Sequence, residues 1–168
     1  VMNLGELQQY DTPQMIFERP SNEFVAGFVG EPPMNFLDCE LKQEGDSYYL
    51  VSQSFRFSLP TTVSQQIQHN RVTSQKMKLG VRPQDMVAYR EQKTGREITG
   101  EVFFWETRGD EAALMVRLEE NKNLFMVSTP PDFNAIKGER VFLDFDPEKI
   151  NIFDQKTTLN ILASEKSF

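Results

Sequence analysis

FVAGFVGEPPMNF, residues 24–36, is the stretch in which the chain changes from helical to extended sequence. Its first half is apolar and keeps helical spacing up to Gly30. Pro32 and Pro33 then prevent the helix from continuing, because proline lacks a backbone N–H and clashes with the preceding turn. A strand-like pattern begins at Phe36. The stretch therefore predicts a helix, an exposed hinge with limited motion, and then β-structure. The residues expected to form this hinge are Gly30, Pro32, Pro33, Met34 and Asn35.

Residues 1–30 are expected to form a small arm before the hinge. Residues 1–11 predict a β-hairpin that turns at Leu4-Gly5-Glu6, since glycine tolerates a positive φ. Thr12 followed by Pro13 is a favoured helix start, and a second short helix is expected after a Ser21 or Asn22 cap. We expect the apolar face of this second helix to be covered, by the β-structure or by a second copy. That face consists of Phe24, Val25 and Phe28.

Residues after the hinge predict a mainly β fold. Roughly ten short strands follow one another at turn-like spacing, the last of them TLNIL at residues 158–162. Residues 61–70 are polar and fit either a helix turn or a loop. With no long helix, this pattern favours a closed or partly closed β-barrel. The side chains expected to point into its core are Ala112, Leu114, Val116, Leu118, Val141, Leu143 and Phe145.

Composition excludes several classes of protein. The net charge of −7 argues against a nucleic-acid or anionic-membrane surface, because both require clustered cations. A single cysteine, Cys39, excludes an internal disulfide, and together with the single histidine, His69, it excludes a Cys/His zinc cage. No apolar run approaches the length of about 20 residues that spans a bilayer. Because the chain opens in mid-pattern at Val1, we expect it to be a piece of a longer protein.

Candidate chemical sites are few. GREITG at residues 95–100 is the nearest match to a phosphate-binding loop, but Glu101 stands where that loop needs its lysine. His69 has no nucleophile-elbow context and is expected to be a surface residue. The acids of DFDPE, residues 144–148, lack the glycine and glutamate of an EF-hand loop. Phe103, Phe104 and Trp105 are expected to fill the core, with the first and third on one face.

Several motifs resemble one family. FVAGFVGEPPMNF is similar to the junction between the ATPase domain and the C-terminal domain in ATP-binding subunits of carbohydrate-importing ABC transporters. LGVRP at residues 79–83, ETRGDE at 106–111 and NIFD at 151–154 also resemble segments of that family. Glu31 replaces the usual small residue, and Asn151 replaces the usual histidine. The candidate regulatory or interface residues carried over from these motifs are Arg82, Glu106, Gly109, Glu111, Phe153 and Asp154.

The resemblance implies a domain division and a fold. Residues 1–30 would be the tail of a truncated nucleotide-binding domain, residues 31–36 a hinge, and residues 37–168 a regulatory β-barrel of the TOBE or OB type. The phosphate loop, the signature motif and the switch histidine would lie upstream, so this chain is not expected to be an enzyme or to hold a cofactor or metal. The intact protein would use ATP and Mg²⁺.

The resemblance also implies partners. The intact subunit would lie in the cytoplasm, on the inner face of the plasma membrane, and would contact permease subunits through the missing ATPase domain. A second copy of the chain and a regulatory protein or small effector are the other expected partners. The alternative is a stand-alone OB-type module that binds a small ligand or an oligosaccharide. A nucleic-acid partner is not expected, because the acidic composition argues against it.

Overall fold

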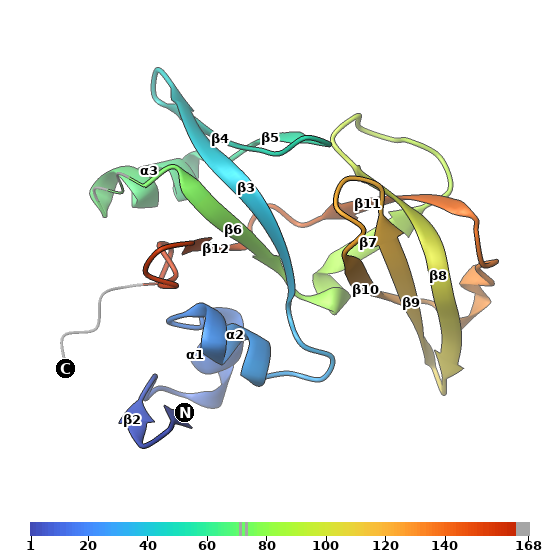
Figure 1. Cartoon of the computed structure of the whole chain (residues 1–168), viewed down its shortest axis with the longest axis horizontal. Coiled ribbons are helices and arrows are strands. Elements are labelled where there is room, and N and C mark those ends of the chain that lie inside the picture. The colour runs from blue at the N-terminus through green and yellow to red at the C-terminus, as the bar shows by residue number, and fades with distance from the viewer. Residues whose placement is uncertain (71, 73, 164–168) are drawn as a thin grey trace.

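The computed structural model describes residues 1–70, 72 and 74–163. Ten of its strands form two five-stranded sheets, so the fold is mainly β, as the sequence predicts. Figure 1 shows the two sheets side by side along the longest axis of the molecule. Residues 164–168, which the expected regulatory domain includes, lie outside the described residues.

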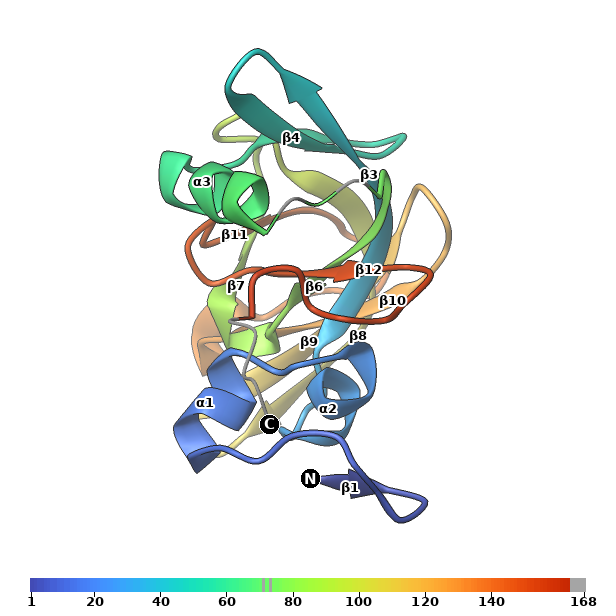
Figure 2. The same ribbon diagram turned by 90° about the vertical axis from the view of Figure 1, so that its left-hand side faces the viewer.

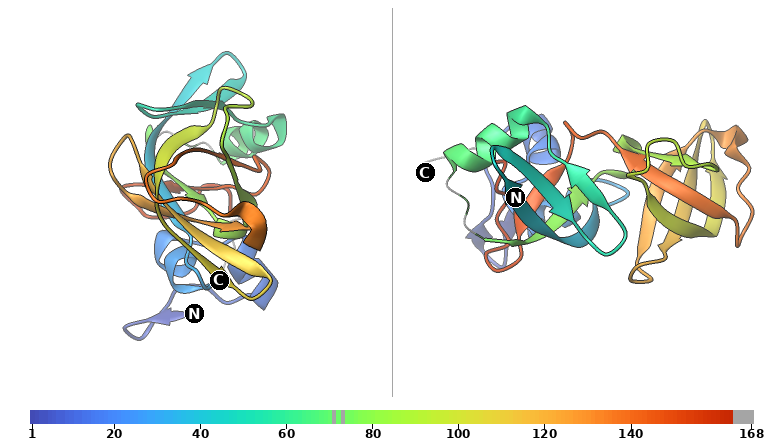
Figure 3. Two further views of the ribbon diagram at one scale, coloured as in Figure 1. Left: turned by 90° about the vertical axis from the view of Figure 1, so that its right-hand side faces the viewer. Right: turned by 90° about the horizontal axis from the view of Figure 1, so that it is seen from above.

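The first sheet has the strand order β12-β6-β3-β4-β5 and the second has β10-β9-β8-β11-β7. The chain enters the second sheet after β6 and returns to the first with β12, so two connections join the sheets (Figure 3). The strands of the first sheet are β3 (Asn35–Glu44), β4 (Ser47–Val51), β5 (Arg56–Ser58), β6 (Lys76–Val81) and β12 (Asn151–Asp154). Those of the second are β7 (Met86–Tyr89), β8 (Ile98–Arg108), β9 (Glu111–Leu118), β10 (Leu124–Thr129) and β11 (Arg140–Phe145).

The arm contains the expected hairpin and two short helices. β1 (Met2–Asn3) pairs with β2 (Glu6–Leu7) around Gly5, which has a φ of 87°. The helices are α1 (Pro13–Glu18) and α2 (Glu23–Phe28). Thr12 caps α1 and Asn22 caps α2, each through a side-chain oxygen that accepts a backbone N–H. Figure 2 shows both helices on the side of the first sheet where β12 lies.

A common core joins the two sheets. Ala112, Leu114, Val116 and Leu118 of β9 are buried, as predicted. The predicted inward residues of β11, which are Val141, Leu143 and Phe145, are buried too. The ring of Phe145 contacts that of Phe57 in β5, with centroids 5.1 Å apart. The alternating apolar pattern is therefore the element of the sequence that determines which strand faces point inward.

The hinge is only partly the exposed connector that was predicted. Glu31 and Pro33 are exposed, but the side chains of Met34 and Asn35 are only 4% and 8% exposed. β3 begins at Asn35, one residue earlier than expected. The Met34 side chain is buried because it packs against Gly80 and Phe153. A Cβ added at Gly80 would lie 2.5 Å from the Met34 sulfur.

The structure decides between the alternatives for residues 61–70 and corrects the expected strand at TLNIL. Residues 61–69 form a helix, α3 (Thr61–His69), with Val63 and Ile67 buried. TLNIL makes only isolated bridges, from Leu159 to Asn22 and from Asn160 to Phe153, so it is not a strand. Short 3-10 helices, η1 (Pro83–Asp85) and η2 (Pro131–Phe133), complete the described structure.

A β-bulge changes the facing of the aromatic cluster in β8. The register shifts between Val102 and Phe104, so that Trp105 pairs with Leu114 and packs against the core. Phe104 is half exposed, and the Phe103 ring lies 4.6 Å from the guanidinium of Arg117. The prediction that Phe103 and Trp105 share one face was therefore wrong, because the inserted residue reverses the alternation.

Candidate functional site

Arg82 connects the arm to the first sheet. It follows the last residue of β6 in the LGVRP motif, and its side chain is only 2% exposed. Its guanidinium donates hydrogen bonds to the backbone oxygens of Phe17 at 2.8 Å, Ala26 at 3.1 Å and Val29 at 2.6 Å. These three carbonyls lie near the C-terminal ends of α1 and α2.

The environment of Arg82 suits a cation. The last carbonyls of a helix have no partner within the helix and carry the negative end of its dipole. Arginine has five N–H donors in a planar fork, so one side chain serves several carbonyls. The guanidinium also lies 4.2 Å from the centre of the Phe17 ring. Burial lowers the pKa of Arg82, and the neighbouring carboxylate of Asp85 opposes that change.

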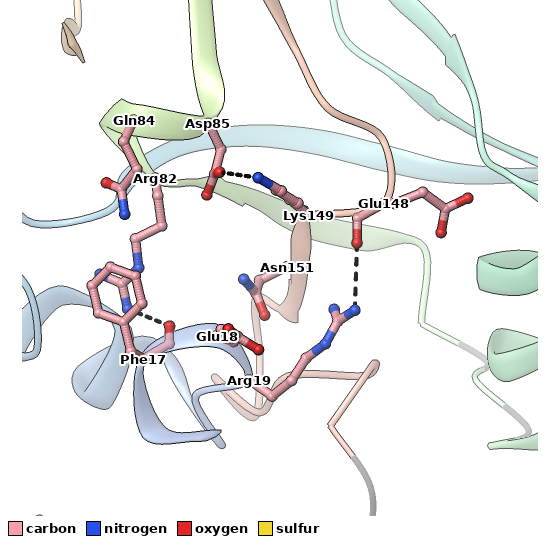
Figure 4. Close-up of a pocket in the computed structure, with 9 residues that line it drawn as sticks. All are labelled: Phe17, Glu18, Arg19, Arg82, Gln84, Asp85, Glu148, Lys149 and Asn151. Atoms are coloured by element: carbon pink, nitrogen blue, oxygen red, sulfur yellow. Dashed lines mark hydrogen bonds and ion pairs between the residues drawn. The ribbon is translucent and has the colours of Figure 1, made fainter. Parts of the chain in front are cut away.

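A pocket of about 490 Å³ lies beside Arg82, between the arm and the sheets (Figure 4). Three segments line it: residues 17–19 at the end of α1, residues 82–85 after β6, and residues 148–151 before and at the start of β12. Arg19 crosses its lower side and donates to the backbone oxygens of Ile150 at 3.2 Å and Glu148 at 3.4 Å. The pocket is therefore closed on one side by a second contact between arm and sheet.

Lys149 and Asp85 form an ion pair at the rim of the pocket. The Lys149 Nζ lies 3.0 Å from the Asp85 Oδ1, and this hydrogen bond raises the pKa of Lys149. The backbone N–H of Asp146 donates to the Asp85 carbonyl at 3.3 Å, which holds the segment before β12 against η1. Asp85 thus has one carboxylate oxygen engaged, and the other is free to accept a hydrogen bond within the described residues.

Asn151 stands at the position where the resembled family has histidine. It is 1% exposed, and its Oδ1 accepts a hydrogen bond from the Asn160 Nδ2 at 2.8 Å. The same Asn160 nitrogen donates to the Pro20 carbonyl at 2.8 Å, so this pair of amides also fastens the arm. In Figure 4 the Asn151 amide lies across the pocket from Arg82.

Phe153 and Asp154, which lie just after Asn151 in the chain, make contacts that stabilise the fold. Phe153 is fully buried and packs edge-on against Phe36, with ring centroids 5.7 Å apart. The Asp154 carboxylate accepts the backbone N–H groups of Lys156 and Thr157 at 2.8 and 2.9 Å. Partial burial acts to raise the pKa of Asp154, but these hydrogen bonds outweigh it and lower the pKa.

Glu106, Gly109 and Glu111 lie elsewhere. They form the tip of the β8–β9 hairpin in the second sheet, and all three are exposed (Figure 1). Gly109 has a φ of 70°, which the turn requires and which glycine adopts without strain. The structure therefore divides the sequence-predicted residues into two places. Arg82, Phe153 and Asp154 lie near the arm, and the hairpin tip is separate.

Asn35 has a role that sequence reasoning missed. Its side-chain amide donates to the Met126 carbonyl at 2.7 Å and accepts the Met126 N–H at 2.8 Å. Because Asn35 begins β3 and Met126 lies in β10, this double hydrogen bond joins the two sheets. A lone asparagine after a Pro-Pro pair carries no sequence signal for such a partner, which lies 91 residues further on.

The remaining candidate sites have ordinary environments. In the GREITG region, the Glu97 carboxylate accepts the backbone N–H groups of Lys93, Thr94 and Gly95 at 2.6 to 2.8 Å. Burial acts to raise the pKa of Glu97, but these hydrogen bonds outweigh it and lower the pKa to about 2. His69 is exposed, and Asp144 pairs with Arg96 at 3.0 Å. Within the described ranges, no group of His, Cys, Asp and Glu could hold a metal ion.

Comparison with known families gives a consistent result. Residues 30–86 match the family described as the MalK OB fold domain, and residues 79–153 match the TOBE domain. Residues 30–153 of this chain therefore belong to the OB and TOBE domains found in ATP-binding subunits of sugar importers.

Two curated relatives support this assignment. The chain is 31% identical over 159 residues to the xylose/arabinose import ATP-binding protein XacK of Haloferax volcanii, covering 94% of this chain and 39% of the relative. It is 32% identical over 163 residues to the trehalose/maltose import ATP-binding protein MalK of Thermococcus litoralis, covering 94% and 42%. The chain thus spans about two fifths of the length of these relatives.

A solved structure shares the fold at low identity. The cytoplasmic molybdate-binding protein ModG, solved with molybdate bound, aligns with a TM-score of 0.55 and 9% identity. The alignment covers 70% of this chain and 94% of ModG. Among the described residues, no helix has the length and apolar character needed to cross a bilayer.

Proposed function

We propose that this chain is the regulatory and dimerisation part of the ATPase subunit of an ABC importer for sugars or related solutes. The observation that carries the proposal is the continuous similarity to sugar-import ATP-binding subunits over 94% of the chain. The intact protein would bind ATP and Mg²⁺, couple hydrolysis to transport, and contact permease subunits on the cytoplasmic face of the plasma membrane.

The arm supports a regulatory role. Residues 1–30 would be the end of the nucleotide-binding domain, residues 31–36 the hinge, and residues 37–168 the regulatory domain. Arg82 and Asn160 donate hydrogen bonds to backbone carbonyls of the arm, those of Phe17 and Pro20. In the opposite direction, Arg19 of the arm donates to the backbone carbonyl of Ile150. Such contacts would transmit a change in the sheets to the arm, and hence to the ATPase domain. A ligand or partner that prefers one arrangement would then shift the transport cycle by its difference in affinity.

Self-association is the property to test first. Phe24 and Phe28 stack with ring centroids 5.6 Å apart, and Phe28 remains 68% exposed. Of the three residues of this face, only Val25 is fully buried by the rest of the chain. Sedimentation velocity of the chain over a wide concentration range should show a dimer at high concentration. A species that remains monomeric to about millimolar concentration would contradict the dimerisation part of the proposal.

Nucleotide binding provides a second test. Titration of the chain with Mg-ATP in a calorimeter should give no saturable heat, because Glu101 stands where a phosphate loop needs lysine. The intact subunit, titrated in parallel, should bind. Saturable micromolar binding by the chain alone would show that the assignment of catalysis to the missing part is wrong.

A further inference from the structure

Two buried residues that line the pocket, Arg82 and Asn151, carry hydrogen-bonding groups without partners in the described structure. Arg82 Nε is buried and has no hydrogen-bond partner among the described residues. A buried N–H without a partner is energetically unfavourable, so native proteins generally satisfy such groups with protein, water or ligand. Asn151 is also buried, and only its oxygen is engaged, so its amide N–H₂ is a second unused donor within the described structure.

The pocket also offers exposed donors and acceptors. Gln84 is exposed, and its side chain makes no hydrogen bond within the described structure. Asp85 has one carboxylate oxygen unused, and Glu18 accepts a single bond from Gln14 at 2.9 Å. The Phe17 ring supplies an apolar wall on the arm side. Donors and acceptors thus face the same space from three segments of the chain.

The charges around the pocket are balanced. Glu148 turns its carboxylate toward Thr62, at 3.2 Å, and presents only its backbone to the pocket. The positive charge of Arg82 faces the negative ends of α1 and α2. The charged groups that remain are Arg19 and Lys149 against Glu18 and Asp85. Because the charges balance, a charged ligand gains no net electrostatic attraction, and the affinity for a neutral ligand is not reduced.

We propose that this pocket binds a small neutral polyhydroxylated molecule, such as a mono- or disaccharide. Each hydroxyl is both a donor and an acceptor, which matches a wall that presents unused groups of both kinds. The volume of about 490 Å³ falls in the range of about 300–1,000 Å³ that is typical of ligand pockets.

The position of the pocket gives the ligand a regulatory effect. A ligand in the pocket would contact residues 17–19 of the arm and residues 82–85 beside the sheet at the same time, so it binds best when the arm is docked. Binding therefore stabilises the docked arm by mass action. This inference deepens the proposed regulatory function, since it assigns that function a site and a class of effector.

NMR of the ¹⁵N-labelled chain tests the inference directly. The probes are D-glucose and maltose, with glucose 6-phosphate as the charged counterpart. We expect saturable shift changes with a neutral sugar, in the millimolar range or tighter, at the Arg82 Nε–H and the Asn151 side-chain amide. Gln84→Ala and Glu18→Ala should each weaken binding about fivefold, the equivalent of one hydrogen bond.

Gln65→Ala is the matched control, because Gln65 is an exposed glutamine on α3 outside the pocket. It should bind the sugar like the unaltered chain. The inference is overturned if neither neutral sugar binds, if glucose 6-phosphate binds more tightly, or if Gln84→Ala binds as Gln65→Ala does. This measurement needs no ATPase domain. The chain could fail to bind sugar and still self-associate, so the experiment distinguishes failure of the sugar-binding proposal from failure of the proposed function.

Discussion

Replacing Arg82 by methionine should release the arm while the two sheets remain folded. Three hydrogen bonds of 2.6, 2.8 and 3.1 Å to helix-end carbonyls would be lost. Hydrogen bonds to charged groups contribute about 1.5–3 kcal/mol each, so the gross loss is about 4.5–9 kcal/mol. Burying a guanidinium costs several kcal/mol, which methionine avoids. We therefore expect the free energy of arm docking to fall by about 2–4 kcal/mol.

Hydrogen exchange of backbone amides measures this local change. Exchange in α1 and α2 should accelerate by about 30- to 700-fold, since each 1.4 kcal/mol corresponds to a factor of ten. Amides of β9 and β11 should change little. Arg140→Met is the control, because Arg140 is exposed and its side chain makes surface contacts outside the arm, an ion pair with Glu119 at 3.3 Å and a contact with the Phe142 ring. Unchanged exchange in the arm, or an equal effect from Arg140→Met, would refute the role of Arg82 as the anchor of the arm.

The other predictions concern the sheets. Leu143→Ala should lower the free energy of unfolding by about 2–5 kcal/mol in denaturant melts, and a loss of a few tenths would mean that Leu143 is not in the core. Gly100→Ala should cost about 1–3 kcal/mol, because the new Cβ would lie 2.9 Å from the backbone oxygen of Arg117; an unchanged melt would contradict this. Glu97 has a pKa of about 2 against an ordinary 4.5, so its carboxylate stabilises the fold above pH 4.5 and loses this effect as the pH falls toward 2. Urea melts of Glu97→Gln should therefore show a deficit at pH 7 that shrinks over that window, and a deficit independent of pH would exclude the carboxylate as its cause.

Local sequence signals determined much of the fold. The caps at Thr12 and Asn22 and the Pro32-Pro33 pair act through neighbouring backbone groups, so their effects could be read without the fold. Alternation in β9 and β11 likewise identified the buried faces, since neighbouring side chains of a strand point to opposite sides. The family motifs identified the OB and TOBE domains, and the comparisons confirmed them.

Local signals were misleading wherever a distant partner decided the outcome. The bulge in β8 depends on pairing with β9, and it moved Trp105 to the core face against the simple alternation. TLNIL has the composition of a strand, but the backbone N–H of Asn160 donates to the Ser21 carbonyl of the arm at 2.9 Å, and its side chain donates to Pro20 and Asn151. The division of ten strands into two sheets also depends on where β12 returns, which no local pattern specifies.

The candidate site shows the same division between local and distant causes. The sequence by itself determined that Arg82 belongs to LGVRP, a motif that resembles a segment of sugar-import ATPase subunits. Only the tertiary structure decided what Arg82 binds, because its acceptors are carbonyls 53 to 65 residues away. Any residue type supplies a backbone carbonyl, so these acceptors leave no trace in the sequence. The pocket is likewise formed by three separate segments, which become neighbours only when the arm folds back onto the sheet.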